Sequence, residues 1–347
     1  MKKVGQYFKA FKYLFGSYLF LSVVTVQAKS IEYKWSTGHA MPTAMQEIYP
    51  AVFNGKIYVG GGFIAGGEGT FFGLSPSRRV FIFNPDHSAW NETAKLPEAR
   101  HHLGLVSNTQ YLYGIGGFSD KKGKVWQIQD SVYRLAEKED RWLSGPELPL
   151  PLASSVYASV NNNIHIIGGK TRNDIIGKNV DTDKHYILKE NEQWVEMASA
   201  TIKRNSAASA VIGDRIYVIG GRTSGPNFKN LSFAEFYDVE RNSWTQISPL
   251  PVALAGLSAT ALNGKVFVFG GEAFSETGKW QSGKAYNQVW VYSPDKNSWD
   301  KVSDMPTPRH GHGSITLDGK VYVIGGAEKV GPQQTLASTI ILTEKRD

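Results

Sequence analysis

The sequence predicts an all-β protein, a six-bladed β-propeller, because two markers repeat with one rhythm along the chain. The first marker is a glycine doublet after an apolar strand, and it occurs at Gly61-Gly62, Gly116-Gly117, Gly168-Gly169, Gly220-Gly221, Gly270-Gly271 and Gly325-Gly326. The second marker is a tryptophan that keeps the same spacings of 55, 52, 52, 50 and 55 residues, at Trp35, Trp90, Trp142, Trp194, Trp244 and Trp299. A period near 50 residues, with several short strands in each repeat, is typical of a propeller.

Each repeat is expected to supply four strands, and the fifth repeat shows the plan most clearly. Its first strand covers 257–262, and Asn263-Gly264 forms a tight hairpin turn into the second strand at 265–269. The glycine doublet ends the second strand where neighbouring backbones crowd together. The third strand covers 288–292, and the fourth begins at Trp299. Four short strands in about 53 residues match one propeller blade.

The positions of the tryptophans predict how the ring closes. Trp35 precedes the first glycine doublet, whereas no tryptophan follows the last doublet. The last repeat therefore supplies three strands, near 313–317, 321–324 and 339–342, and the N-terminal strand near 32–35 should complete that blade as its outermost strand. Joining both chain ends in one blade closes the ring and leaves no unpaired edge.

Residues 1–28 are predicted to be a signal peptide rather than part of the fold. Four lysines precede a short apolar stretch at 14–26, and Val26-Gln27-Ala28 is an acceptable cleavage site. The mature protein is then expected at 29–347, as one propeller domain that is periplasmic or secreted from a bacterium. A retained N-terminal anchor is the alternative interpretation.

The charge balance gives little support to a nucleic-acid partner. Cleavage removes four lysines and no acidic residue, so the formal net charge falls from +7 to +3. We therefore expect no nucleic-acid partner and, once the signal is cleaved, no membrane partner. The sequence contains no cysteine, which excludes disulfides and thiolate metal sites. A homodimer is left open.

No cofactor and no metal are expected. His310-Gly311-His312 places two imidazoles on one side of a strand, as half of a metal site would, but no third and fourth ligand follow with suitable spacing. Neither a G-x-S-x-G turn nor a phosphate-binding loop occurs in the sequence.

The candidate site follows from the antiparallel geometry of the first two strands of each blade. The start of the first strand and the end of the second lie at one face, so residues flanking these points should surround one mouth of the central channel. The cationic, imidazole and amide residues at these points are Arg100, His101, His102, Lys170, Arg204, Asn205, Arg222, Arg309 and His310. The carboxylates are Glu47 and Glu272.

A concave cluster of arginines would draw a carboxylate or sulfate, because the guanidinium offers a planar fork to an oxyanion. Arg222 is expected to be the strongest single contact, because it follows a glycine doublet and is followed by small residues. The alternative is structural: the arginines near the first strands would tie one blade to the next, and His101 and His102 would be satisfied packing groups.

Two tryptophans outside the repeat positions favour a sugar as the ligand. Trp126 and Trp280 lie in long loops after a glycine doublet, on the same predicted mouth. Flat aromatic faces beside polar groups suit the apolar face of a pyranose ring. The alternative is that these loops pack their aromatic residues on one another to hold themselves in place.

The repeat pattern itself resembles a known family. An Arg or His before the first strand, a second strand that ends as Ile-Tyr-Val-Ile-Gly-Gly at 216–221, a third strand near a turn, and a fixed tryptophan are similar to the kelch repeat. The resemblance covers essentially all of 32–345 and implies a kelch β-propeller.

Exported bacterial kelch propellers of this size resemble the sialic-acid mutarotases (N-acetylneuraminate epimerases), which interconvert the anomers of a sugar acid. The resemblance implies Glu272 or Glu47 as the acid–base group and an arginine for the substrate carboxylate. Gly278 stands where that family has an arginine six residues after its catalytic glutamate. The other interpretation is a non-catalytic propeller that holds an acidic monosaccharide, a glycan or a protein. Whether the protein is an enzyme is left open.

Overall fold

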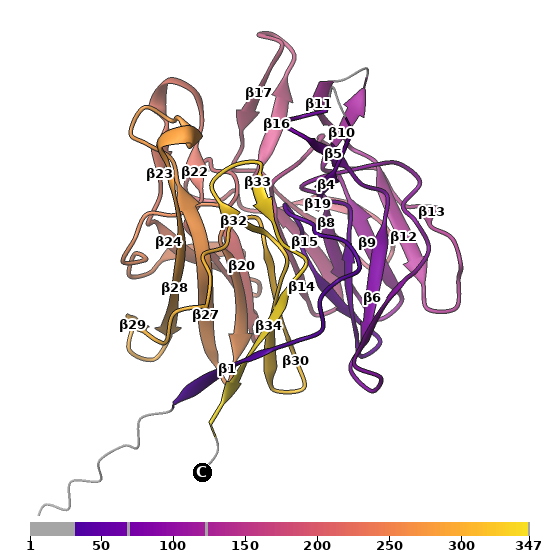
Figure 1. Cartoon of the computed structure of the whole chain (residues 1–347). Coiled ribbons are helices and arrows are strands. Elements are labelled where there is room, and N and C mark those ends of the chain that lie inside the picture. Colours follow the sequence, from indigo (N-terminus) through magenta and orange to yellow (C-terminus); the bar gives the residue numbers. More distant parts are fainter. Residues whose placement is uncertain (1–31, 68–69, 122–123, 346–347) are drawn as a thin grey trace, which may run out of the picture. The chain divides into compact units, whose positions relative to one another are not determined.

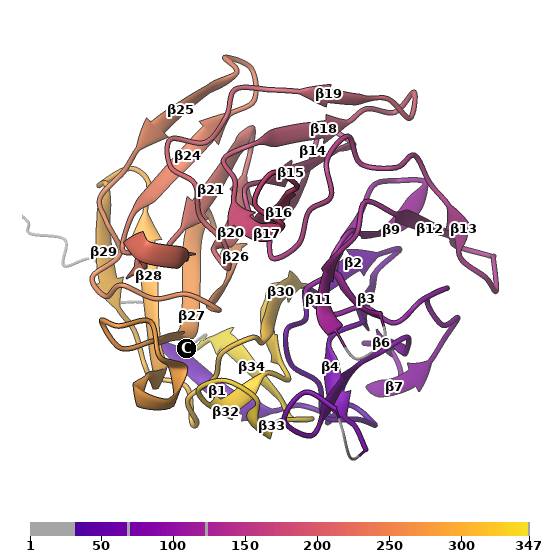
Figure 2. The ribbon, with the colours of Figure 1, turned by 90° about the horizontal axis from the view of Figure 1, so that it is seen from above.

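Six four-stranded antiparallel sheets form the six blades of the propeller (Figures 1 and 2). The computed structural model describes residues 32–67, 70–121, 124–345; the predicted signal peptide, 1–28, lies outside these residues. The first three blades consist of β2 (Ala51–Phe53), β3 (Lys56–Gly60), β6 (Val80–Asn84) and β7 (Ala89–Glu92); β8 (Gly104–Ser107), β9 (Tyr111–Ile115), β12 (Val132–Ala136) and β13 (Leu143–Ser144); and β14 (Val156–Val160), β15 (Asn163–Ile167), β18 (His185–Leu188) and β19 (Trp194–Glu196).

The other three blades follow the same order. They consist of β20 (Ala208–Ile212), β21 (Arg215–Ile219), β24 (Ala234–Asp238) and β25 (Ser243–Gln246); β26 (Ser258–Leu262), β27 (Lys265–Ala273), β28 (Lys284–Ser293) and β29 (Ser298–Lys301); and β30 (Gly313–Leu317), β31 (Lys320–Ile324), β34 (Thr339–Glu344) and β1 (Tyr33–Thr37). The first strand of each blade lies next to the central channel, as Figure 2 shows from above. The predicted all-β propeller with six blades is confirmed.

The closure of the ring is also as predicted. Strand β1 pairs antiparallel with β34, and Trp35 lies opposite Leu342. The sixth blade is therefore completed by the N-terminal strand, which gives this blade the same four strands as the others.

Two-stranded extensions rise from the blades at one end of the channel, which we call the mouth face (the top of Figure 1). They are β4 (Phe63–Ala65) with β5 (Leu74–Pro76), β10 (Phe118–Lys121) with β11 (Lys124–Ile128), β16 (Lys170–Asn173) with β17 (Lys178–Asp181), β22 (Arg222–Thr223) with β23 (Lys229–Asn230), and β32 (Ala327–Lys329) with β33 (Gln333–Thr335). In the fifth blade the long strands β27 and β28 form the extension themselves. Two short 3-10 helices, η1 (Gly225–Asn227) and η2 (Trp280–Ser282), lie in the loops of this face.

The glycine doublets are explained by contacts between neighbouring blades. All twelve glycines have a positive φ, between 48° and 105°, which disfavours side chains with a Cβ. A Cβ on Gly116 would lie 2.2 Å from the carbonyl oxygen of Leu152 in the next blade. In five blades the second glycine donates its N–H to a carbonyl of the next blade at 2.7–2.9 Å: Gly117 to Leu152, Gly169 to Arg204, Gly221 to Leu254, Gly271 to Arg309 and Gly326 to Met45.

The repeat tryptophans also connect neighbouring blades. Each indole Nε1 donates to a carbonyl oxygen of the preceding blade or of the segment next to it: Trp35 to Ser303, Trp90 to His39, Trp142 to Ala94, Trp194 to Pro146, Trp244 to Ala198 and Trp299 to Ser248. Both sequence markers therefore share one period, because each makes a contact that recurs once between every two neighbouring blades.

Substituting one repeat tryptophan should remove one such contact. We expect Trp244→Phe to lower the free energy of unfolding by about 1 kcal/mol, because its 2.8 Å hydrogen bond to the Ala198 carbonyl is lost. Urea denaturation would measure the change. Trp35→Phe is the matched control, since its bond is 3.4 Å long and exposed, and its loss should be smaller. An equal loss in both variants would contradict this account of the tryptophans.

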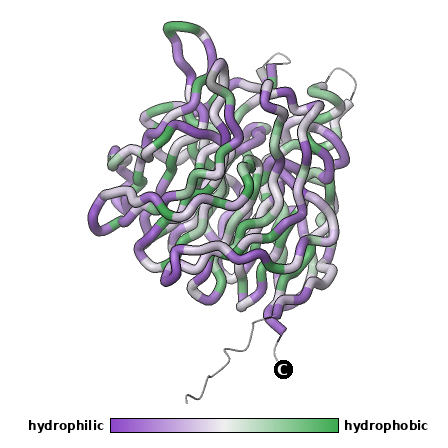
Figure 3. The backbone as a smooth tube through the Cα atoms, turned by 90° about the vertical axis from the view of Figure 1, so that its left-hand side faces the viewer, coloured by the Kyte–Doolittle hydropathy of each residue, from purple (hydrophilic) through white to green (hydrophobic). Residues whose placement is uncertain are grey.

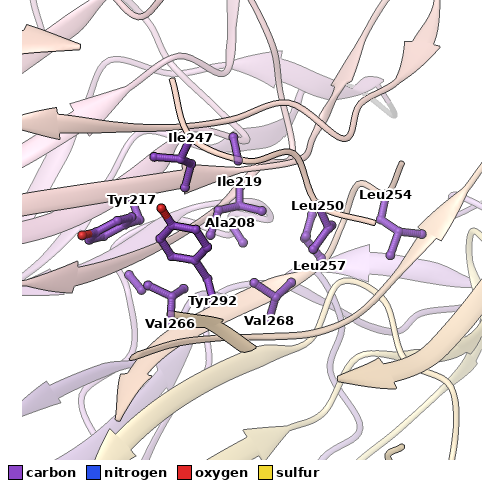
Figure 4. Close-up of a cluster of buried hydrophobic side chains, with 12 residues drawn as sticks. Ala208, Tyr217, Ile219, Ile247, Leu250, Leu254, Leu257, Val266, Val268 and Tyr292 are labelled. Carbon is purple, nitrogen blue, oxygen red and sulfur yellow. The ribbon is translucent and has the colours of Figure 1, made fainter. Parts of the chain in front are cut away.

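The apolar core lies between the blades, where second strands from neighbouring sheets face each other. In Figure 4, Tyr217 and Ile219 of β21 pack with Val266 and Val268 of β27. The tube in Figure 3 is hydrophobic along many interior segments and hydrophilic at most outer turns. Nowhere in the described part of the chain does a helix reach the length and hydrophobicity that a membrane crossing requires.

Candidate functional site

A closed ring of backbone hydrogen bonds surrounds the channel just above the innermost strands. Its members hold the same place in each blade and all have a positive φ of 51–59°: Glu47, His102, Ser154, Ser206, Gly256 and Gly311. The N–H of each donates to the carbonyl of its counterpart in the preceding blade at 2.6–3.5 Å, and Glu47 closes the ring on Gly311. We call this the backbone ring. A left-handed conformation at a residue other than glycine costs of order 1–3 kcal/mol and is concentrated at functional sites.

The register predicted for the mouth is confirmed. In each blade the residue after the glycine doublet forms an antiparallel bridge with the residue just before the backbone ring: Gln46 with Phe63, His101 with Phe118, Ala153 with Lys170, Asn205 with Arg222, Ala255 with Glu272 and His310 with Ala327. The two sets of positions identified in the sequence therefore do lie side by side at one end of the channel.

Above the backbone ring lies a cavity of about 440 Å³, which we call the mouth cavity. Of the predicted site residues, it is lined by Glu47, His102, Trp126, Lys170, Asn205, Arg222, Glu272, Trp280 and His310. Four other predicted residues, Arg100, His101, Arg204 and Arg309, do not line it. The structure thus brings together both carboxylates, one arginine, one lysine, one asparagine, two histidines and both loop tryptophans.

The three arginines before the first strands turn into their own blades instead of the mouth. Arg204 donates to the carbonyls of Val218, Gly220 and Phe233 and forms a 2.6 Å ion pair with buried Glu235. Burial lowers the pKa of Arg204 to about 10, although Glu235 opposes the shift.

Arg309 and Arg100 are held in the same way. Arg309 donates to the Gly325 and Ser338 carbonyls, and burial lowers its pKa to about 10. Arg100 donates to the Ser131 hydroxyl at 2.8 Å and pairs with Glu98 at 2.6 Å. The structural interpretation is therefore the correct one for these arginines, and the predicted ring of mouth arginines reduces to Arg222.

His101 lies behind the cavity wall as a packing residue. Its ring stacks on Phe63 and Phe118, with centroids 3.9 and 5.1 Å away. Its Nε2 lies 2.7 Å from the Val125 carbonyl oxygen and its Nδ1 lies 2.7 Å from Nδ1 of His102. Burial, and then the neighbouring His102, hold the pKa of His101 well below its ordinary value.

A chain of hydrogen bonds connects His101 to the cavity. A carbonyl oxygen can only accept, so His101 Nε2 carries the proton and, in the neutral ring, its Nδ1 accepts. His102 must then donate from Nδ1, while its Nε2 faces Glu47 Oε2 at 2.9 Å. His102 Nε2 and the carboxylate of Glu47 thus lie together at the floor of the mouth cavity.

Glu47 is held ionised by this environment. Burial alone would raise the pKa of Glu47, but the charge and hydrogen bond of His102, together with His310 and Arg222, lower it to about 2. Glu47 is therefore already deprotonated at neutral pH. It cannot serve there as the proton donor that the sequence interpretation allowed.

Glu272 is anchored by a second set of contacts. Its Oε1 accepts from Arg222 at 2.6 Å, and its Oε2 accepts from the Gly331 N–H at 3.3 Å. The Arg222 guanidinium also lies over the ring of Phe274, 3.8 Å from the centroid. Both predicted acid–base carboxylates thus line the cavity, and both are paired.

His310 stands between the two carboxylates. Its Nε2 lies 2.8 Å from the Lys329 carbonyl and so carries a proton. Its Nδ1 lies 3.4 Å from Glu272 Oε2 and 3.7 Å from Glu47 Oε1. The Nδ1 of His310 therefore faces both carboxylates, and it has no hydrogen-bond partner among the described residues.

A further cluster of polar side chains at the mouth surrounds Lys170. Its Nζ lies 3.1 Å from Asp181 and 2.6 Å from the Ser224 hydroxyl. The Asn205 amide donates to Asp181 at 2.7 Å and to the Ser224 hydroxyl at 3.1 Å. The position of Lys170 after a glycine doublet signalled its place, but nothing in the sequence pattern indicated Asp181 and Ser224 as its partners.

Aromatic side chains form the upper walls of the cavity. Trp126 contacts Phe71 and Phe118 with ring centroids 5.3 and 5.1 Å apart, and 40% of its surface is exposed. Trp280 meets Phe72 of the first blade at 5.7 Å. Phe228 and Phe274 stack nearby. The loops do pack their aromatics on one another, and several of those rings also face the cavity.

Among the described residues no group of three or more His, Cys, Asp or Glu side chains is placed to hold a metal ion. The imidazoles of His310 and His312 do not share a site, since His310 faces the mouth cavity and His312 lines a separate chamber on the other side of the backbone ring.

The fold and the site together define the class of protein. It is a six-repeat propeller with a polar, aromatic-walled cavity over its channel. The family model of the KLHDC2/KLHL20/DRC7 kelch-repeats domain matches residues 153–343, and the chain belongs to the kelch-repeat proteins.

Its relatives are longer proteins. The chain is 24% identical to Kelch-like protein terF of Aspergillus terreus, over 87% of this chain and 66% of that protein. It is 31% identical to human Kelch-like protein 15 over 57% of this chain and 33% of that protein, and 23% identical to human Kelch-like protein 23 over 91% and 52%. The chain thus spans between one third and two thirds of the length of these relatives. A solved structure titled "Structure of YjhT" shares the fold, with a TM-score of 0.72 at 16% identity, over 89% of this chain and 99% of that chain.

Proposed function

We propose that the mouth cavity binds an acidic monosaccharide, or the acidic end of a glycan, and that Arg222 is its charged contact. The observation that carries the proposal is the state of this guanidinium. Arg222 Nη2 pairs with Glu272, while its buried Nε has no hydrogen-bond partner among the described residues. Arg100 and Arg309 also have an unpartnered Nε, but neither lines the cavity. Among the described residues Arg222 is the arginine that lines the cavity, so its guanidinium is the one placed to meet a ligand carboxylate.

The walls support a sugar as the carrier of that carboxylate. Trp126, Trp280 and Phe274 line the same cavity as the polar side chains of Asn205 and Ser224. This combination suits a ring that has one apolar face and several hydroxyls. An exported location, as proposed from residues 1–28, would expose the cavity to free sugar acids.

A mutarotase acting on a sugar acid is the second candidate, and the position of His310 favours it. Anomer exchange needs one group that protonates the ring oxygen and one that accepts the anomeric proton. His310, with its Nδ1 3.4 Å from Glu272 Oε2, places an imidazole beside a carboxylate, two kinds of group that serve in general acid–base catalysis. Because Glu47 is held ionised with a pKa of about 2, Glu272 and His310 are the better acid–base pair.

Calorimetric titration with N-acetylneuraminate, glucuronate and neutral hexoses would test the binding proposal. We expect the acidic sugars to bind more tightly than the neutral ones, and Arg222→Ala to weaken their binding about 10- to 100-fold, as the loss of a charged hydrogen bond would. Arg172→Ala is the matched control, because Arg172 is an exposed arginine of the mouth face outside the cavity. Equal affinity for acidic and neutral sugars, or an unchanged affinity in Arg222→Ala, would refute the assignment.

Anomer exchange measured by NMR on the same samples separates the two candidates. A mutarotase would accelerate exchange of the bound sugar acid, and Glu272→Gln should remove the acceleration while binding persists. Tight binding with an exchange rate equal to that in buffer would leave only the binding function.

A further inference from the structure

A second chamber lies beneath the backbone ring, inside the channel. Its volume is about 370 Å³, and its walls are the innermost strands of all six blades, β2, β8, β14, β20, β26 and β30. We call it the lower chamber. It and the mouth cavity have no lining residue in common. The backbone ring separates a charged site above from this chamber below.

One corner of the lower chamber contains buried polar atoms that lack partners. Within the described residues, both ring nitrogens of His312 and the hydroxyls of Ser258 and Ser314 have no hydrogen-bond partner, and these residues are only 3%, 7% and 6% exposed. All three residues line the chamber and belong to the neighbouring fifth and sixth blades, and their unpartnered atoms lie just behind its surface. Unpaired buried donors and acceptors are costly, so several beside one chamber favour a polar occupant that these side chains would meet after a small rotation.

Other hydroxyls on the same walls are already committed to the protein. Ser107 donates to the Val52 carbonyl at 2.6 Å, Ser209 to the Tyr157 carbonyl at 3.3 Å and Thr316 to the Ala261 carbonyl at 2.7 Å. These bonds join neighbouring innermost strands. The hydroxyls of Ser258 and Ser314 therefore differ from them in having no such structural use.

The chamber selects against charged ligands. No Asp, Glu, Lys or Arg is among its lining residues. Burial, and then the positive charges of Arg309 and His310, hold the pKa of His312 well below its ordinary value, so its ring is neutral. A neutral imidazole and two hydroxyls offer both donors and acceptors. An ionised ligand would lose its hydration here without gaining a counter-charge.

The size and the aromatic residues of the chamber narrow the class of ligand further. A volume of about 370 Å³ is at the lower end of the range for small-molecule pockets. Tyr49 and Tyr157 line the wall in an edge-to-face pair with centroids 5.4 Å apart, and most other lining residues are small. We propose that the lower chamber is a second binding site, for a small uncharged polyol of monosaccharide size held by His312, Ser258 and Ser314.

Histidine-detected NMR would test this site with D-glucose as the probe and D-gluconate as its charged analogue. With imidazole carbons labelled, we expect glucose to shift the His312 signal saturably at millimolar concentrations and gluconate to leave it unchanged. Ser258→Ala and Ser314→Ala should each weaken glucose binding about 3- to 10-fold through loss of one hydrogen bond. We choose these two small substitutions because a substitution of the buried His312 could prevent folding.

Two controls separate this site from its surroundings. Ser209→Ala removes a hydroxyl from the same chamber that is bonded to the protein, so glucose affinity should not change. Arg222→Ala, in the mouth cavity, should also leave the glucose response intact. The proposal is overturned if glucose produces no saturable shift, so that water alone occupies the chamber. It is equally overturned if gluconate binds as well as glucose, or if Arg222→Ala abolishes the response.

Discussion

Replacing Arg204 by methionine is expected to lower the free energy of unfolding by about 3–5 kcal/mol, the range for breaking a buried ion pair. Arg204 and Glu235 are 3% and 0% exposed and lie 2.6 Å apart. Without the guanidinium, Glu235 would be a buried carboxylate without its cation, and the Phe233 carbonyl would lose its 3.1 Å donor. Chemical denaturation monitored by tryptophan fluorescence would measure the change.

The double variant Arg204→Met, Glu235→Met should recover most of that loss, because it removes both charges together. Arg215→Met is the matched control in the same blade: Arg215 is about half exposed and 4.0 Å from Asp238, so its removal should change stability by less than about 1 kcal/mol. If Arg204→Met leaves stability unchanged but weakens sugar binding, Arg204 is a ligand contact and its placement in the blade is wrong.

Acidification should destabilise the protein through a buried pair of histidines in the third blade. His165 and His185 are both 0% exposed, and Nδ1 of His165 lies 3.0 Å from Nε2 of His185. Burial lowers the pKa of His165 to about 4 and, with the neighbouring His165, that of His185 to about 3. In the unfolded chain both pKa values return to about 6.5.

The direction of the effect follows from proton binding. Above about pH 6.5 both states hold these rings neutral, so the full stability is present. As the pH falls from there toward 4 and 3, the unfolded chain binds protons that the folded protein excludes, so stability is lost by about 1.4 kcal/mol per pH unit for each histidine. The pair alone should cost about 5 kcal/mol by about pH 4.5.

Denaturation midpoints recorded between neutral and acidic pH would show this dependence. The variant with both His165→Leu and His185→Leu should have a shallower acid limb than the wild type. His87→Leu, which changes an exposed histidine, should keep the wild-type slope. Equal slopes in the wild type and the double variant would show that this pair does not bind its protons on unfolding.

The fold could be predicted from the sequence because its repeated contacts require particular residue types. Gly116 must be glycine because a carbonyl of the next blade occupies the place of a Cβ, and Trp244 must carry an indole N–H to reach the preceding segment. Such requirements recur once per blade and are visible as a rhythm. The closure of the ring by the strand that contains Trp35 followed from the same rhythm, since no tryptophan follows the last glycine doublet.

The candidate site was predicted less completely, because a repeat defines where a residue lies along the backbone but not where its side chain points. Arg204 and Asn205 are adjacent, yet Asn205 lines the cavity and Arg204 enters the blade to meet Glu235. Neighbouring residues of an extended chain point to opposite sides, so both could not face the mouth. Arg309 and His310 show the same alternation.

The partners of the carboxylates were also beyond the sequence pattern. Glu272 meets Arg222, which holds the same repeat position in the fourth blade, and Gly331 from the sixth blade. Glu47 meets His102 from the second blade and His310 from the sixth blade. These contacts depend on the curvature of the closed ring, which brings three blades to one point.

A crystal structure of the protein grown with N-acetylneuraminate would test the central claim most directly, because it would locate the carboxylate. We expect the sugar in the mouth cavity, with its carboxylate within hydrogen-bond distance of the Arg222 guanidinium and its ring against the aromatic wall that includes Trp126 or Phe274. A sugar bound at saturating concentration with its carboxylate away from Arg222, or a mouth cavity that contains only water, would contradict it.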